Sequence, residues 1–298
     1  MARPLTAADV AVAIATCGRP DALHRCLAAL AGGSERPGAV VVVDQAPSSR
    51  AREIVMACGL PARYVEQTRR GLSASRNRGL AETSGAVLAV TDDDCVPDPH
   101  WVRTLVAAFA RDPRPTAVTG RILALGPPAP GLHAISLREG GAAVDHRGRR
   151  TPWQVGSGGN FAAWTATLRA QGGWDERLGA GSPGRAAEDL ELLDRLLGSG
   201  ELVRYDPAVV VRHERQDAGR RLASRWSYGY GVGALVGLLA RRRDGFAARV
   251  LAAYVTLHLR GLRTAARDGD AFRARQHTRA LAALGPGALY GLRAGLPR

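Results

Sequence analysis

Three consecutive aspartates, Asp92, Asp93 and Asp94, directly follow an apolar, β-prone run at residues 85–91. Adjacent carboxylates repel one another and lose hydration at the end of a buried strand, so they need a cation to neutralise them. Oxygen ligands suit a hard divalent ion such as Mg²⁺ or Mn²⁺, typically shared with a substrate phosphate. Alone, the triplet favours a solvated acidic turn; the rest of the chain argues for a binding site.

Polar residues also follow the first two expected strands. Thr16 and Arg19 come at and just after the end of the first strand, and Asp44 ends the second. In an α/β sheet a nucleotide can lie across this edge, and Asp44 can accept hydrogen bonds from a base or a ribose. These three residues are therefore expected to contact a nucleotide.

A helix start with small residues and two positive charges occurs at residues 70–77, which include Gly71, Arg76 and Asn77. Backbone N–H groups and the helix dipole at such a start can hold a phosphate or a ribose. We expect Gly71, Arg76 and Asn77 to contact the nucleotide. Arg76 can also stabilise charge on a leaving phosphate, or it can simply pair with an acidic side chain.

A second acidic pair, Glu188-Asp189, begins a later helix. The spacing of Glu188, Glu191 and Arg195 indicates a solvent-facing side of that helix. A carboxylate placed there can serve as a general base.

The first half of the chain alternates strand and helix patterns. Strands are expected at 10–15, 40–44, 62–65, 86–91 and 116–122. Helices are expected at 20–31, 48–58, 73–82 and 99–111. This order predicts a mostly parallel sheet covered by helices on both faces.

The second half is less regular, and residues 123–158 are expected to be mainly loop. After them come a short segment at 160–164, helices at 165–171 and 188–197, and strands at 202–205 and 209–211. From residue 217 onward the pattern predicts three helices, at 218–241, 244–267 and 270–283.

Eight separated segments, taken together, resemble the family 2 glycosyltransferases with the GT-A fold over roughly residues 9–215. The segments are, in order, 15–20, 42–44, 71–77, 91–94, 156–161, 172–176, 188–191 and 206–213. Each one is a weak signal, but their order and spacing are specific. Two positions depart from the family pattern, because Gln45-Ala46 follows Asp44 and Cys17 replaces a tyrosine or asparagine. These departures weaken the prediction for base recognition.

The resemblance implies an α/β fold of the GT-A type, a Rossmann-like, mostly parallel sheet with helices on both faces. A catalytic domain at 1–215 would carry a basic, mainly helical C-terminal extension at 216–298. The implied activity is inverting and metal-dependent, and it moves a sugar from a nucleoside-diphosphate sugar to an acceptor hydroxyl. The acceptor classes left open are a glycan, a lipid-linked glycan and a small natural product.

The resemblance also assigns roles to residues of this chain. Asp189 is the implied general base, with Glu188 as the next candidate; the base deprotonates the acceptor for a single displacement at the anomeric carbon. The implied ligands of a Mn²⁺ or Mg²⁺ ion are Asp92, Asp94 and His213. The implied contacts to the nucleotide sugar are Asp44, Asp92, Asp93, Gly159 and Asn160.

The net charge of +14 is concentrated at the C-terminal end, where residues 214–298 hold 16 arginines against five acidic residues. All 41 basic residues are arginine, which removes lysine as a catalytic base. The tail can lie on an anionic membrane surface or pack on the catalytic domain as an ordinary helical extension, and we weigh the two equally. Alternatively, Trp226, Tyr228 and Tyr230 can line an acceptor channel.

Cysteine and hydropathy patterns bear on location. The four cysteines show no C-x-x-C spacing, and residues 1–9 lack the apolar segment of a signal peptide. The longest tail run, 228–240, is shorter than the roughly 20 apolar residues of a transmembrane helix. We therefore expect a cytoplasmic protein that can reach the inner face of the cell membrane.

Three rival functions can be weighed against this prediction. A sugar-phosphate nucleotidyltransferase would carry a glycine-rich basic loop after the first strand, whereas residues 16–20 lead straight into a helix. A basic nucleic-acid-binding protein would leave the acidic motifs unexplained, so no nucleic-acid partner is expected. A catalytically inactive sugar-binding relative is disfavoured by those same intact motifs.

Overall fold

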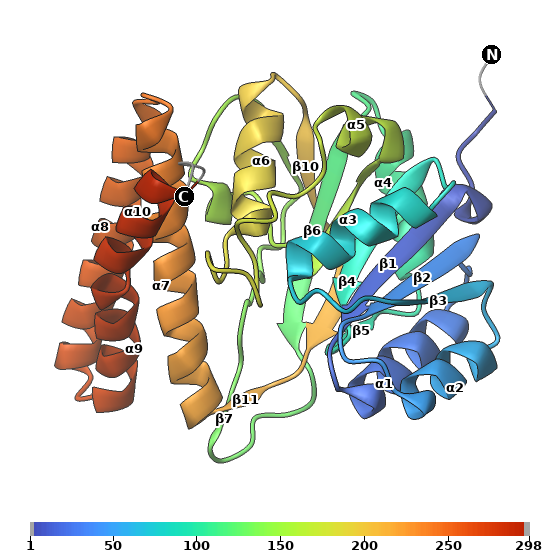
Figure 1. The fold of residues 1–298 in the computed structure, drawn as a ribbon, viewed down its shortest axis with the longest axis horizontal. Helices are drawn as coiled ribbons and strands as arrows, with labels where there is room; N and C mark the ends of the chain where they lie inside the picture. Colours follow the sequence, from blue (N-terminus) through green and yellow to red (C-terminus); the bar gives the residue numbers. More distant parts are fainter. Residues whose placement is uncertain (1–2, 295–298) are drawn as a thin grey trace.

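The computed structural model describes residues 3–294 (Figure 1). Its strands are β1 (Val10–Thr16), β2 (Ala39–Asp44), β3 (Ala62–Glu66), β4 (Val87–Asp92), β5 (Cys95–Pro97), β6 (Ala117–Ala124), β7 (Leu132–His133), β8 (Val144–His146), β9 (Asn160–Trp164), β10 (Val203–His213) and β11 (Gln216–Asp217). Its α-helices are α1 (Pro20–Ala31), α2 (Ser49–Ala57), α3 (Leu72–Glu82), α4 (Trp101–Ala110), α5 (Thr165–Ala170), α6 (Glu188–Gly198), α7 (Ala218–Arg241), α8 (Phe246–Arg267), α9 (Ala271–Ala282) and α10 (Leu284–Arg293).

Among the described residues, nine strands form one sheet in the order β3-β2-β1-β4-β9-β6-β10-β5, with β8 also paired to β10. The first four strands in that order are parallel, and β6 is parallel to β10. Strand β9 runs antiparallel between β4 and β6, and β5 and β8 run antiparallel to β10. The predicted mostly parallel sheet with helices on both faces is confirmed.

Strand β1 shows why the sheet is buried on both faces. Val10, Val12 and Ile14 point to the side on which α1, α2 and α4 pack, and Ala11 and Ala13 point to the side of α3, α5 and α6. Successive side chains of a strand alternate between faces. A strand covered on both sides therefore reads as a continuous apolar run, which is how the sequence revealed it.

The structure differs from the sequence-based expectation in its short elements. The expected loop at 123–158 contains β7, β8 and a 3-10 helix at Pro152–Gln154, and a fourth tail helix, α10, follows the three predicted ones. The expected strands at 202–205 and 209–211 are one strand, β10, whose pairing with β6 shifts between Asp206 and Val210. Elements of two or three residues are too short to show a period, and Pro207 cannot donate to a sheet ladder.

The tail helices form a bundle beside the sheet, and α7 lies on the side of the bundle that faces it (Figure 1). Ala187, which precedes α6, belongs to the same apolar cluster as Val232 and Leu235 of α7. A Cβ added to Gly231 would lie 2.7 Å from the Cβ of Ala186, so α7 contacts the main chain just before Glu188. The helical extension thus packs on the part of the chain that contains the sheet and α6.

Helices α7 and α10 approach closely because glycines replace larger side chains where they cross. On α7 these are Gly233 and Gly237, spaced four residues apart and hence on one side of the helix, whereas Gly229 on the same side meets Ala280 of α9. A Cβ on Gly233 would lie 2.2 Å from the main-chain oxygen of Leu284, at the start of α10. Real Cβ atoms do not approach a carbonyl oxygen so closely, so the packing requires glycine.

Replacing Gly233 with alanine should therefore push α10 away from α7 and destabilise the protein. Overpacking of this kind typically costs about 1–3 kcal/mol, which corresponds to a fall in Tm of roughly 2–10 °C for a chain of this size. Gly285→Ala is the matched control, because its added Cβ meets nothing within 4 Å. Thermal unfolding of both variants tests the packing, and an equal Tm for the two would contradict it.

No helix among residues 3–294 combines the length and the apolar character needed to span a membrane.

Candidate active site

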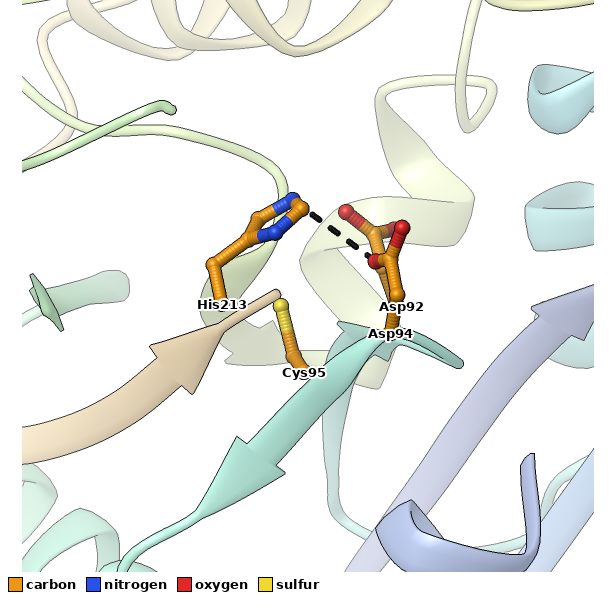
Figure 2. Close-up of side chains that lie close together, drawn as sticks. All are labelled: Asp92, Asp94, Cys95 and His213. Atoms are coloured by element: carbon orange, nitrogen blue, oxygen red, sulfur yellow. Dashed lines mark ion pairs between the residues drawn. The ribbon is translucent and has the colours of Figure 1, made fainter. Parts of the chain in front are cut away.

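The aspartate triplet lies where β4 ends and a short turn leads into β5. Asp92 is the last residue of β4, and the antiparallel pairing of β5 with β10 places Cys95 opposite His213. Figure 2 shows the side chains of Asp92, Asp94 and His213 gathered around one point, with the Cys95 sulfur beside them. Residues more than 100 positions apart in the sequence thus meet at one edge of the sheet.

The donor set fits a divalent cation. One ligand atom each from Asp92, Asp94, Cys95 and His213 can be chosen so that all lie within 4.8 Å of one another. Asp94 Oδ1 is buried without a hydrogen-bond partner among the described residues, and His213 Nε2 lies 3.6 Å from it, too far for a hydrogen bond. Two atoms that share a metal at about 2.1 Å each lie roughly this far apart.

The imidazole of His213 is oriented for such a role. Its Nδ1 lies 3.0 Å from the main-chain oxygen of Glu214 and can donate a proton to it, which leaves the Nε2 lone pair facing Asp94. Burial raises the pKa of the Cys95 thiol well above its ordinary value. A neutral thiol is a poor ligand for a hard cation, so the oxygen and imidazole atoms are the fitting donors.

Asp93 is bonded to other side chains of the protein and is not part of the candidate metal-ligand cluster. Its side chain is fully buried, accepts a hydrogen bond from Thr16 Oγ1 at 2.7 Å, and is paired with Arg19. Arg19 also donates to Asp94 Oδ2 at 2.6 Å. Burial, opposed by Arg19 and reinforced by Asp94, raises the pKa of Asp93 to about 7. Thr16 and Arg19 line the cavity described below, although their polar groups are engaged with the triplet.

Arg76 connects the parts of the site. This side chain is only 3% exposed; it donates to Asp92 Oδ1 at 3.0 Å and to Glu188 Oε1 at 2.9 Å. A third bond, of 3.2 Å, goes to the main-chain oxygen of Gly158. A Cβ at Gly158 would lie 2.6 Å from Arg76 Nη1, so a larger residue there would push the guanidinium away from its partners. The sequence left open whether Arg76 would contact a phosphate or pair with an acidic side chain, and in the structure it pairs with Asp92 and Glu188.

The helix start at Glu188 is not solvent-facing, contrary to the expectation from its spacing. Glu188 and Glu191 are 7% and 5% exposed, because Arg76 pairs with the first and Arg195 with the second. Burial and the neighbouring Asp189 raise the pKa of Glu188 to about 7. Ala187 adopts a left-handed backbone with φ of 71°, a strained conformation for a non-glycine residue that turns the chain into α6.

Asp189 differs from its neighbour because it faces open space. Its Oδ2 accepts a hydrogen bond of 2.8 Å from the main-chain N–H of Gly158, and its Oδ1 accepts one from Leu190. These two bonds fix the carboxylate, and no basic residue in the described part of the chain forms an ion pair with it. Asp189 is thus partly exposed, oriented and able to accept a proton.

A cavity of about 910 Å³ joins these groups. From the sheet edge it is lined by Thr16, Arg19, Gln45, Arg76, Asp92, Asp94 and His213, and from the glycine-rich loop and α6 by Gly156, Ser157, Gly158, Gly159, Glu188 and Asp189. Its far part is lined by α7, α8 and α9. The predicted metal ligands and the predicted base therefore share one cavity.

Five of the predicted nucleotide-binding residues are not among the lining residues: Asp44, Gly71, Asn77, Asp93 and Asn160. Asp44 is 1% exposed, and its oxygens accept from the Ala46 N–H at 2.9 Å and the Tyr64 hydroxyl at 2.8 Å. Asn77 exchanges hydrogen bonds with the main chain of Trp174. Asn160 accepts from the Trp101 indole and donates to two main-chain oxygens. Each of the side chains of Asp44, Asn77 and Asn160 is engaged in holding elements together, and its contact with a nucleotide stays a prediction.

Glycines at two predicted positions lie closer to the cavity. Gly159 lines it, and a Cβ there would lie 3.1 Å from Asp92 Oδ2. Gly71 is the N-cap of α3 with φ of 145°, a conformation that requires glycine, and its N–H donates to Gln45 Oε1 at 2.6 Å. Gln45, one of the departures from the family pattern, thus takes a place at the cavity wall.

Sequence reasoning missed the far part of the cavity. Arg221, Arg225, Tyr228 and Val232 line it from α7. Their spacing of four, three and four residues is the period of one helix face and could have revealed the set. Of the three aromatic residues considered for an acceptor channel, Tyr228 lines the cavity, whereas Trp226 and Tyr230 are not among its lining residues.

Comparison with known proteins agrees with this geometry. The sequence model of the family described as "Glycosyl transferase family 2" matches residues 11–160, about half of the chain. A "Pre-mycofactocin glycosyltransferase" of Mycobacterium tuberculosis is 27% identical over 253 residues, which is 82% of this chain and 50% of that protein. A "Probable glycosyltransferase YdaM" of Bacillus subtilis is 26% identical over 204 residues, 64% of this chain and 47% of that protein. The chain thus spans about half the length of these curated relatives.

Solved structures match over nearly the whole chain. A mannosyltransferase from Pyrobaculum calidifontis, in complex with GDP-Man and Mn²⁺, has a TM-score of 0.61 and 17% identity and covers 97% of this chain and 88% of its own. Residues 1–349 of S. aureus TarS have a TM-score of 0.59 and 13% identity and cover 93% and 91%. At such low identity these matches establish a shared fold, the GT-A type.

Proposed function

This chain belongs to glycosyl transferase family 2, and on that premise we propose that it transfers a sugar from a nucleoside-diphosphate sugar to an acceptor hydroxyl with inversion. The observation that carries the proposal is the shared cavity. Asp92 and Asp94 lie on one side of it and Asp189 on another, and Arg76 connects them through Asp92 and Glu188. A donor held by the triplet would therefore present its anomeric carbon toward the carboxylate of α6.

On the donor side, Asp92, Asp94 and His213 would hold a divalent cation, Mn²⁺ or Mg²⁺. When bound, the cation would neutralise charge on the diphosphate leaving group. Arg76 is already engaged with Asp92 and Glu188, so its role is to hold those carboxylates in position. Arg19 likewise restrains Asp94. Gly159 lets the chain run close beside Asp92.

On the acceptor side, Asp189 would remove the proton of the attacking hydroxyl. Its Gly158 and Leu190 hydrogen bonds hold it in one orientation, which lowers the cost of positioning the base. Glu188 is buried against Arg76 and is the weaker candidate. One base, with a displacement at the anomeric carbon and no covalent intermediate, gives inversion.

A transfer assay tests this proposal. The protein is incubated with Mn²⁺, UDP- and GDP-sugars and a panel of hydroxylated acceptors, and release of nucleoside diphosphate is measured. NMR of the isolated product then reads the anomeric configuration. We expect release that EDTA suppresses and a product with inverted configuration. A retained configuration would contradict the single displacement, and no release from any donor would contradict the activity.

The rival functions fit less well. The family match favours a glycosyltransferase over a sugar-phosphate nucleotidyltransferase. The relatives described above are named as glycosyltransferases, which also argues against a nucleic-acid-binding protein. The absence of a nucleic-acid partner stays a prediction that a salt-dependent DNA-binding assay can test.

Membrane docking of the tail stays a second prediction. Leu251 and Leu259 of α8 are 39% and 45% exposed, on a helix that also carries exposed arginines. If these residues meet anionic lipid, the protein should pellet with anionic vesicles at low salt and dissociate at high salt. Joint replacement of Arg241, Arg242 and Arg243 by glutamine should weaken pelleting. If the wild-type protein stays in the supernatant at low salt, the prediction of membrane docking is wrong.

A further inference from the structure

The far part of the cavity, away from the aspartate triplet, is built from the C-terminal helices. We define the α7 pocket as the cluster of cationic, aromatic and imidazole side chains that line it there. Its members are Arg221, Arg225 and Tyr228 of α7, Tyr254 and His258 of α8, and His277 of α9. Apolar neighbours from the same helices, Val232 and Leu257, complete this wall.

Two arginines of the α7 pocket lack an acidic partner among residues 3–294. Arg221 is only 8% exposed, and its Nη1 has no hydrogen-bond partner within residues 3–294. The Nε atoms of Arg221 and Arg225 both donate to one neutral acceptor, Gln276 Oε1, at 2.9 and 3.3 Å. Burial, together with the nearby Arg225, lowers the pKa of Arg221 to about 10. Buried cations without a counter-charge are costly and mark a place where an anion would be stabilised.

The two histidines of the pocket are hydrogen-bonded to each other, and burial favours their neutral forms. His258 Nδ1 and His277 Nδ1 lie 2.9 Å apart, so one ring donates to the other. Burial and the nearby His277 and Arg225 lower the pKa of His258 to about 4, which keeps it neutral near pH 7. The His258 ring also lies against Tyr254, with 4.3 Å between centroids. Its place is therefore fixed.

We propose that the α7 pocket binds an anionic group, a phosphate or a carboxylate, carried by the acceptor. This inference rests on the proposed function, because it places the acceptor's anion in the pocket and its hydroxyl at Asp189. Guanidinium groups match the two oxygens of a carboxylate or a phosphate. The apolar side chains nearby favour an acceptor in which the anion is joined to an apolar or aromatic body. The enzyme thus selects small amphiphilic anions.

The donor diphosphate is the other anion that the cavity could hold, but the geometry separates the two. The donor's charge is accounted for by the cation-binding residues at the end of β4, whereas Arg221 and Arg225 come from α7 and contact neither Asp92 nor Asp94. Tyr228 of the pocket and Asp189 line the same cavity, so an acceptor held in the pocket can extend toward the acceptor side.

Binding of small probes tests the inference without knowledge of the acceptor. Phenyl phosphate and benzoate are titrated calorimetrically into the wild type, Arg221→Gln and Arg220→Gln, with benzyl alcohol as the uncharged probe. We expect at least one of the two anions to bind the wild type and benzyl alcohol to bind much more weakly. The tighter anion identifies the charged group. Arg221→Gln should lower its affinity by about tenfold or more, the usual effect of losing a charged hydrogen-bond partner.

Arg220→Gln is the matched control, because Arg220 is the exposed neighbour of Arg221 on the same helix and does not line the cavity. Its probe affinity should equal that of the wild type. The Tm of Arg221→Gln should stay equal or rise, since the substitution removes an uncompensated buried charge. A falling Tm with unchanged probe affinity would assign Arg221 a structural role and overturn the inference. So would failure of both anions to bind the wild type.

Titration of nucleoside diphosphates with Mn²⁺ into the same variants separates this inference from the proposed function. We expect their affinity to be unchanged in Arg221→Gln. If it falls with that of the anionic probes, the pocket belongs to the donor and the inference is wrong. If no nucleoside diphosphate binds the wild type, the proposed function fails, and the acceptor assignment of the pocket fails with it.

Discussion

Replacing Asp189 with asparagine should lower the turnover of sugar transfer by about 10²-fold or more, the usual effect of losing a general base. The amide keeps the size of the side chain and can still accept the Gly158 N–H bond through its oxygen. It cannot take a proton from an acceptor hydroxyl. Binding of the nucleoside diphosphate should change little, because Asp189 lies on the acceptor side of the cavity.

Glu188→Gln is the informative comparison. Glu188 pairs with the buried Arg76, so this substitution should disturb the arrangement of Arg76 and Asp92 and thereby weaken donor binding. Steady-state kinetics on both variants distinguishes the two effects, since the first lowers kcat and the second raises the apparent KM for the donor. Near-normal turnover in Asp189→Asn, with strong loss in Glu188→Gln, would transfer the role of base to Glu188.

Replacing Asp94 with alanine should abolish most of the Mn²⁺-dependent affinity for a nucleoside diphosphate. Removing even a residue that supports a metal ligand commonly costs 10–100-fold, so losing a ligand should cost on the order of 10²-fold or more. The orphaned Asp94 Oδ1 facing His213 Nε2 is the observation behind this expectation. Calorimetric titration with Mn²⁺ present and absent measures the difference.

Asp98→Ala controls for a general loss of negative charge near this edge. Asp98 lies four residues further along the chain, pairs with Arg212, and is not part of the ligand cluster. The Asp98→Ala variant should retain the full Mn²⁺-dependent affinity for the nucleoside diphosphate. If Asp94→Ala and the wild type bind the nucleoside diphosphate with equal affinity in Mn²⁺, the assignment of Asp94 as a metal ligand is wrong, whatever the activity of either protein.

Much of the fold was predictable from local patterns. The runs at 10–15 and 39–43 are continuously apolar because both faces of the sheet are covered, and this pattern predicted the parallel strands. Helix α10 was missed because glycines and a proline at its start resemble a turn. Of these, Gly287 is explained by the close approach of α7, because a Cβ there would lie 2.0 Å from the main-chain oxygen of Tyr230, a contact that no local pattern reports.

Site residues were predictable where they lie in short sequence motifs. They were less predictable where their contacts depend on residues distant in the sequence. Asp92, Asp94, His213 and Asp189 line one cavity, as the motif order implied. Glu188 was misread as solvent-facing because helical spacing cannot show that Arg76 covers it.

The expected contact of Asn77 and Asn160 with the nucleotide stays a prediction, while the structure shows their amides bonded to the main chain of other segments. A single sequence does not reveal which polar groups the fold has already satisfied.

The most direct test of the account is calorimetric titration of UDP, GDP, ADP, CDP and dTDP into the wild-type protein, with Mn²⁺ and with EDTA. We expect at least one of them to bind with Mn²⁺ and to bind at least about tenfold more weakly in EDTA, because the paired carboxylates repel the diphosphate unless a cation neutralises them. If none of the five binds under either condition, the cavity at the end of β4 is not a donor site and the proposed function is contradicted.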